Sequence, residues 1–204
     1  KPEDMKLRLI QGKKFLGCSN QAPDEQYADA LACLRSATPQ SGWNLSGITK
    51  FPPGIALFIG PVTIDGVASS QGTLYNTILS TGGVTLTGRG HGPLVAPNFA
   101  SPLSSVCDGP FYPANLCDKS ITPSELAKWV DAAGERHAGL PLANLAIGTN
   151  GGLSANSWEA PNGITGNVLL GQSLSTGGAT ISIAGSLTVG ANEPSATTIT
   201  RGGL

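Results

Sequence analysis

The segment LSTGGVTL at residues 79–86 returns as LSTGGATI at residues 174–181. Six of the eight positions are identical, and the two that differ are apolar in both copies. Short stretches that repeat in this way, joined by Gly-rich turns, are typical of coils that stack on one another. The repeat therefore predicts a β-solenoid, in which each turn of the chain lies on the turn before it.

Other parts of the chain carry a similar unit, in which an apolar residue, a Ser or Thr and a second apolar residue precede a Gly-containing turn. The units lie at residues 62–64, 84–86, 181–183 and 187–189, and a fainter one with inverted phase lies at 198–200. Alternation places apolar side chains on one face of a strand and hydroxyls on the other, and glycine allows a sharp turn. The spacing from Val62 to Val84 gives a coil of about 22 residues. Strands this short favour a mainly β fold, a three-sided, β-helix-like solenoid, over a β-sandwich.

The composition excludes several other classes of protein. The 204-residue chain contains 28 Gly and 15 Pro, only 12% charged residues and a net charge of −1. Scarce charges exclude charge-driven disorder, and the lack of a three-residue Gly period or of heptads excludes collagen and coiled coils. Near-neutral charge argues against bulk nucleic-acid binding. A basic cluster is either a solvated terminal segment or a contact patch for an anionic surface; it comprises Lys1, Lys6, Arg8, Lys13 and Lys14.

The cysteines form two local pairs, Cys18 with Cys33 and Cys107 with Cys117. Three connectivities are possible, and the simplest hypothesis is one disulfide within each pair, each stabilising a short loop by roughly 2–3 kcal/mol. Disulfides indicate an exported protein, whereas the alternative is four reduced, buried thiols. Neither pair has the close spacing of a zinc knuckle, so we predict no metal site.

We expect two parts of the chain, an N-terminal segment at 1–53 and a β-solenoid domain at 54–204. A first short α-helix is predicted over 23–36, because Pro23 opens it and acidic residues occupy its first turn. The solenoid is interrupted by a long central excursion at about 89–162, which contains the second predicted α-helix. There Thr122 and Glu125 form a capping box around Pro123, and Gly134 ends the helix.

Catalytic patterns are scarce, and we predict a non-enzymatic protein without a cofactor. No nucleophile elbow occurs, and His91 and His137 are interpreted as surface or capping residues. Polysaccharide lyases and hydrolases need clustered carboxylates, but only Asp65 lies at a predicted coil strand. The alternative remains a secreted enzyme that acts on polysaccharide.

The candidate ligand-binding residues lie in the loop between Cys107 and Cys117. A disulfide would hold Phe111, Tyr112 and Asn115 in a small, rigid loop, and aromatic rings with a fixed amide suit stacking on a sugar or a protein partner. The alternative is that Phe111 and Tyr112 pack against the flank of the solenoid. Trp129 is expected on the buried face of the second helix.

A second alternative function is ice binding, because flat arrays of hydroxyls on a β-solenoid can order water. The outward residues that would form such an array are Thr63, Thr85, Ser182 and Thr188.

The stretch from Gly166 to Ala191, with its LSTGG unit, resembles the β-solenoid segments of some large minor pilins of type IV pili. The resemblance covers the coils alone, residues 54–88 and 163–204, and no functional residue of that family can be matched. It implies an extracellular or cell-surface filament protein that functions in adhesion, with pilus subunits, a surface glycan or DNA as partners. Similar Gly/Thr coils occur in phage tail fibres, which are a further alternative.

The chain begins at Lys1 without a Met, and we expect a processed or truncated product. No apolar stretch reaches the roughly 20 residues of a membrane span, so we expect no membrane span in this chain.

Overall fold

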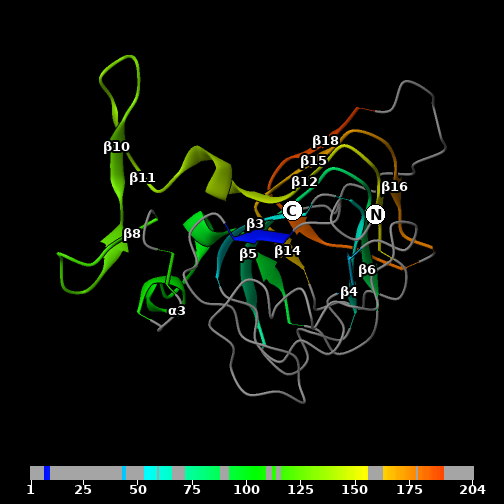
Figure 1. The fold of residues 1–204 in the computed structure, drawn as a ribbon, viewed down its shortest axis with the longest axis horizontal. Coiled ribbons are helices and arrows are strands. Elements are labelled where there is room, and N and C mark those ends of the chain that lie inside the picture. Colours follow the sequence, from blue (N-terminus) through cyan, green and yellow to red (C-terminus); the bar gives the residue numbers. More distant parts are fainter. Residues whose placement is uncertain are drawn as a thin grey trace.

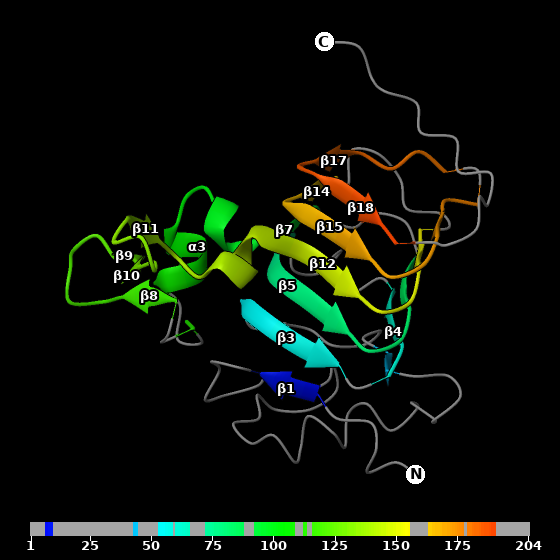
Figure 2. The ribbon, with the colours of Figure 1, turned by 90° about the horizontal axis from the view of Figure 1, so that it is seen from above.

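A computed structural model describes residues 7–9, 43–44, 53–58, 60–65, 72–87, 92–108, 112–113, 116–155, 163–177 and 179–190. It is mainly β and forms a β-solenoid of about five turns, as the repeat predicts. Figure 2 shows the coils stacked in chain order from the N-terminal to the C-terminal end. The predicted helix over 23–36 and the proposed Cys18–Cys33 pair lie outside the described residues.

Three ladders of parallel strands build the solenoid. The first ladder contains β3 (Gly54–Phe58), β5 (Leu74–Ser80), β12 (Leu145–Thr149), β15 (Asn167–Leu170) and β18 (Leu187–Val189). The second contains β2 (Trp43–Asn44), β4 (Val62–Asp65), β6 (Val84–Thr87), β13 (Leu153–Ser154) and β16 (Leu174–Ser175). The third joins the start of β5 to β7 (Leu94–Val95), β14 (Ile164–Thr165) and β17 (Ile183–Ala184).

The N-terminal edge of the first ladder carries a strand of opposite direction. β1 (Leu7–Leu9) pairs antiparallel with β3. The strands of successive coils all run in the same direction. Because β1 runs in the opposite direction, it ends the regular series of parallel strands in the first ladder.

The side chains that point into the coil form one continuous hydrophobic core. Alternation within each strand brings them inward, and the largest fully buried members are Phe58, Ile64, Ile78, Leu86 and Leu94. The more C-terminal coils contribute partly buried residues, which are Leu174, Ile181, Ile183, Leu187 and Val189. The core therefore runs along the axis of the solenoid.

The two copies of the sequence repeat do not occupy equivalent places. Leu79 pairs with Gly148, which pairs in turn with Leu169, whereas Leu174 belongs to the second ladder beside Leu153. The segments that stack in register are STGGV at 80–84 and TNGGL at 149–153, which turn the corner from the first ladder to the second. The repeat predicts a β-solenoid, which the structure shows, although its two copies do not stack on each other. The coil length from Val62 to Val84 is confirmed, because these two residues pair in the second ladder.

A segment leaves the coil between β7 and β12, and we call residues 96–144 the insertion. It contains η2 (Pro97–Phe99), α3 (Ser104–Cys107), β8 (Cys117–Asp118), β9 (Glu125–Leu126), β10 (Lys128–Val130), β11 (Arg136–Ala138) and η3 (Pro141–Asn144). Figure 1 shows it extending to one side, with β10 and β11 at its far end. The insertion is shorter than the excursion predicted at 89–162, because β7, β12 and β13 lie in the ladders.

The predicted helix after Thr122 is wrong, because β9 and β10 occupy this stretch. Glu125 makes an ion pair with Lys128 at 3.2 Å instead of closing a capping box. Gly134, expected to end the helix, has a φ of +84° in the turn between β10 and β11. Strand pairing overrides the helix-like spacing, because Trp129 and Val130 pair across this turn with β11 and Leu126 pairs with Cys117 of β8. The α-helix of the described residues is the four-residue α3.

No helix in the described ranges has the length and hydropathy that a membrane span requires.

Candidate binding surface of the insertion

The insertion rests on the outer face of the first ladder through a second hydrophobic core. Ile55 of β3 packs there with buried residues of the insertion, which are Val106, Cys107, Leu116, Cys117 and Ala143. Tyr75 and Leu79 of β5 border the same cluster. Because this core contains ladder residues, the insertion is fixed to the coil rather than tethered by its ends alone.

Two polar side chains fasten the base of the insertion. The buried Thr77 Oγ1 lies 2.6 Å from the carbonyl of Leu145, the residue that follows the insertion, and 3.3 Å from that of Leu142 in η3. Asn98 Nδ2 donates to the Leu140 carbonyl and to Asn144 Oδ1, both at 2.8 Å, and so joins the two ends of the insertion. These hydrogen bonds replace the bonds to water that the Thr77 hydroxyl and the Asn98 Nδ2 lose on folding.

The predicted disulfide Cys107–Cys117 is confirmed. It joins the end of α3 to β8 with a Cα–Cα distance of 5.5 Å, and both cysteines are buried in the second core. The disulfide therefore stabilises the part of the insertion that packs against the solenoid.

Of the three residues predicted to bind a ligand, the structure describes Tyr112. Its side chain is partly buried against the second core, and Lys119 Nζ lies 4.2 Å from its ring centroid. Lys119 therefore makes a cation–π contact with the ring. Phe111 and Asn115 lie outside the described residues, so their role stays a prediction.

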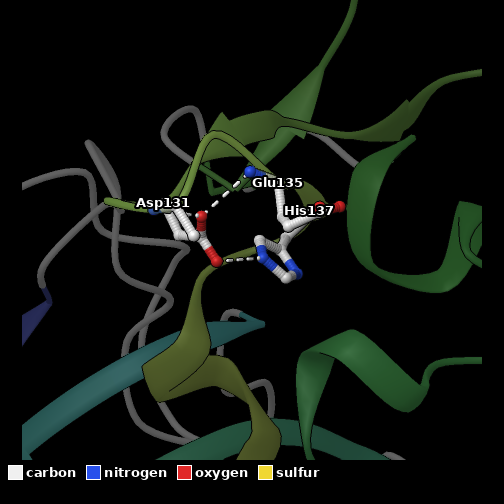
Figure 3. Close-up of polar contacts among 4 residues, drawn as sticks. Asp131, Glu135 and His137 are labelled. Atoms are coloured by element: carbon white, nitrogen blue, oxygen red, sulfur yellow. Dashed lines mark hydrogen bonds and ion pairs between the residues drawn. The ribbon is translucent and has the colours of Figure 1, made fainter.

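The hairpin of β10 and β11 brings together an aromatic and polar cluster of Trp129, His137 and Asp131. Trp129 is paired with His137 across the strands, and their rings stack with centroids 4.7 Å apart and planes inclined by 27°. His137 Nε2 lies 2.9 Å from Asp131 Oδ2, and Figure 3 marks this contact with a dashed line. We call the surface formed by Trp129, His137 and Asp131 the hairpin face.

Asp131 also organises the turn. Its Oδ1 accepts hydrogen bonds from the backbone N–H groups of Ala133 and Glu135, each at 2.9 Å (Figure 3). The bond to His137, together with these backbone bonds, lowers the pKa of Asp131 below its usual value. Asp131 therefore stays ionised and fixes both the turn and the imidazole.

A similar turn lies after β8. Asp118 Oδ1 accepts from the hydroxyl of Ser120 at 2.5 Å and from its backbone N–H at 2.9 Å, which lowers the pKa of Asp118. Among the residues with described positions, no group of three or more His, Cys, Asp and Glu side chains is placed to hold a metal ion.

Sequence reasoning missed Trp129 and His137 as neighbours. The capping box predicts a helix that ends at Gly134, which leaves His137 beyond the helix and away from Trp129. The signal for the hairpin was present in Asp131 and Gly134, because an Asp that starts a turn and a Gly in the left-handed region commonly close a short hairpin.

The hydroxyls considered for ice binding do not all share a face. Thr63 and Thr85 lie side by side on the second ladder, whereas Thr188 lies on the first and Ser182 precedes β17 of the third. On the second ladder, Ser154 and Ser175 continue the row of Thr63 and Thr85 in the next coils. Ice binding stays an untested alternative.

The chain matches no protein-family model, no curated protein and no solved structure.

Proposed function

We propose that this protein is a non-enzymatic surface or filament protein that uses its solenoid to present the insertion for adhesion. The observation that carries the proposal is that the insertion leaves the coil while the ladders continue beneath it. β12, which follows the insertion, pairs with β5 on one side and with β15 on the other. A rigid scaffold with a projecting segment is the usual arrangement of a binding protein whose loops carry recognition.

The cross-section of the coil belongs to the same proposal. We infer that the three ladders form three sides, with the insertion on the outer face of one of them. This places the second core and the hairpin on a single side and leaves the other two sides for packing against neighbouring molecules.

The biological setting follows from the sequence resemblance and from the disulfide. A disulfide between Cys107 and Cys117 suits an oxidising compartment. An extracellular location on a type IV pilus, as a minor pilin in contact with other pilus subunits, accords with both. The surface that it contacts would carry glycan or DNA.

The test compares the full chain with a variant in which residues 98–143 are replaced by a short Gly-Ser linker. Labelled protein is applied to immobilised glycans, to DNA and to cell surfaces, and bound protein is measured. Adhesion by the full chain and at least tenfold weaker adhesion by the variant are expected. Equal adhesion by both proteins overturns the proposal, and release of new reducing ends from a bound polysaccharide supports an enzyme instead.

Two controls separate a loss of binding from a loss of the fold. Circular dichroism checks that the shortened variant retains its β structure. The second control, Leu169→Ser, changes a 47% exposed residue of β15 that lies on the first ladder outside the insertion. We expect this control to adhere like the unmodified chain.

A further inference from the structure

We infer that the hairpin face binds a neutral pyranose ring of a polysaccharide by stacking on Trp129. This inference rests on the proposed function, because it names the ligand class and the residues of the same insertion.

The indole of Trp129 is available because it is used by neither hydrophobic core. The cores of the described residues include Tyr112 and Leu126 of the insertion but not Trp129. All three residues of β11, on which its partner His137 lies, are exposed. Trp129 itself is partly buried, and a partly buried Trp outside both cores stabilises the fold less than a core Trp, which points to a role in binding.

The indole is also held in place before any ligand arrives. The ring of His137 lies 4.7 Å from it, and Asp131 holds His137 through a 2.9 Å bond (Figure 3). Fixing an aromatic ring in advance lowers the conformational entropy that binding must overcome. Sugar rings present C–H groups on their apolar faces, and these groups pack on an aromatic face.

Asp131 supplies a polar group beside the aromatic pair. Its Oδ1 accepts two backbone N–H bonds, whereas Oδ2 is bonded to His137 alone. A carboxylate oxygen has two acceptor positions, so Oδ2 retains one for a sugar hydroxyl. An aromatic platform with an adjacent carboxylate acceptor matches the alternation of C–H faces and hydroxyl edges on a pyranose.

The negative charge of Asp131 beside Trp129 favours neutral sugars over acidic ones. Asp131 is ionised, and Arg136 and Lys128 lie at positions that alternate to the opposite face of the hairpin. Lys128 is also paired with Glu125 at 3.2 Å. A uronic acid placed on Trp129 would bring its carboxylate close to Asp131 without a compensating cation, and such like-charge contacts weaken binding.

Affinity electrophoresis tests the inference. Gels contain one soluble polymer each: galactomannan, xyloglucan, hydroxyethylcellulose or, as the anionic probe, polygalacturonate. We expect at least one neutral polymer to retard the full chain and polygalacturonate to leave its mobility unchanged. Trp129→Ala should weaken retardation at least tenfold, Trp129→Phe should retain part of it, and His137→Ala should weaken it to an intermediate extent.

Val130→Ala is the matched control. Val130 is 58% exposed and neighbours Trp129, but it lies on the opposite face of the same hairpin. Loss of retardation in Trp129→Ala but not in Val130→Ala supports the inference. Backbone amide spectra that keep the shifts of residues 128–138 show that the hairpin is intact in each variant.

Three outcomes overturn the inference. They are the absence of retardation by every neutral polymer, unchanged retardation of Trp129→Ala, and retardation by polygalacturonate that Trp129→Ala leaves intact. The proposed function is judged separately, because it fails only if the chain without its insertion adheres as well as the full chain.

Discussion

At the scale of single residues, two buried hydroxyls carry out the same task in successive coils. Ser80 Oγ donates to the Gly60 carbonyl at 2.7 Å and accepts from Gly82 N at 3.1 Å. Thr149 repeats the pattern one coil later, because its Oγ1 donates to the Gly82 carbonyl and accepts from Gly151 N at 3.0 Å. Each hydroxyl thus joins a corner of its own coil to the corner of the preceding coil.

Replacing Thr149 by Val is expected to lower the free energy of unfolding by roughly 1–3 kcal/mol. The substitution conserves shape but leaves the Gly82 carbonyl and Gly151 N without this hydroxyl, at a site that is 7% exposed. Urea unfolding measures the change. Thr188→Val, an exposed Thr of the same ladder, is the control and should change stability by less than about 0.5 kcal/mol. Equal effects would contradict a structural role for the hydroxyl.

The turn of the hairpin should depend on pH through Asp131. Its pKa in the folded chain lies below the ordinary 3.8, so its contribution to stability is present above that value. The contribution is lost as the pH falls below 3.8 and through the folded pKa, because protonation weakens the bonds to His137 and to the backbone. Amide chemical shifts of Ala133 and Glu135, followed from pH 6 to pH 2, report the transition. A midpoint above 3.8 would contradict the expected direction.

Among the elements, the corners between strands set the tightest steric requirement. A Cβ on Gly82 would lie 2.5 Å from the backbone N of Pro61 and 2.8 Å from its Cα. A Cβ on Gly151 would meet the backbone of Gly82 and Gly83 at 2.6–2.7 Å. Successive corners therefore approach too closely for side chains, which explains part of the high glycine content.

The adjacent glycines at one corner give a matched pair of substitutions. Gly82→Ala should destabilise the protein by about 1–3 kcal/mol, because its Cβ meets backbone atoms that cannot move independently. Gly83→Ala should cost much less, because the nearest atom to its Cβ is the Gly152 carbonyl oxygen at 3.4 Å. Thermal unfolding of the two variants measures the difference. A larger loss in Gly83→Ala would show that the corners do not pack as described.

The sequence predicts the type of element better than its register. Alternation in the short units correctly places β4, β6 and β18, and the repeat correctly indicates stacked coils. The register could be predicted only in part. The spacing from Val62 to Val84 gives the correct pairing of β4 with β6. The repeat does not extend this register, because its identical residues occupy different corners, whereas the stacked corners share only the pattern STGGV and TNGGL. Within the insertion, a local capping signal at Thr122 was overridden by contacts of the hairpin.

The candidate site was predicted only in part, because some of its contacts join parts of the chain that are distant in sequence. Pairing of Cys107 with Cys117 could be inferred from their separation of 10 residues. The positions of Tyr112 and Trp129 depend on which residue packs against Ile55 and its neighbours, a contact between distant parts of the chain. Both side chains are partly buried, but Tyr112 packs against that core and Trp129 packs against His137 instead.

At the scale of the whole molecule, two cores divide the protein into a coil and an insertion. The first core lies along the axis, and the second lies between the first ladder and the insertion. Because the disulfide belongs to the second core, its loss should act on one part more than on the other.

Replacing Cys107 and Cys117 together by Ala is expected to destabilise the insertion by about 2–3 kcal/mol through loss of loop closure. Hydrogen exchange of the amides at 116–140 should become faster, while those of β5, β12 and β15 keep their protection. Reduction of the native disulfide should give the same pattern. Faster exchange throughout the ladders would show that the coil depends on the insertion for its stability.

The base of the insertion also determines which parts of the protein can change in evolution. A Cβ on Gly166 would touch Ala96 Cβ at 2.6 Å and Ala146 N at 3.2 Å, so the chain departs from the coil and rejoins it at a single corner. Segments of other lengths can therefore be exchanged at this point without a change in the coil. Close backbone contacts restrict corner positions such as Gly82 and Gly151 to glycine, whereas the exchanged segment is restricted only by the face on which it rests. In a lineage of such proteins, variation would concentrate in the insertion, and the coil would serve as a constant host for changing specificities.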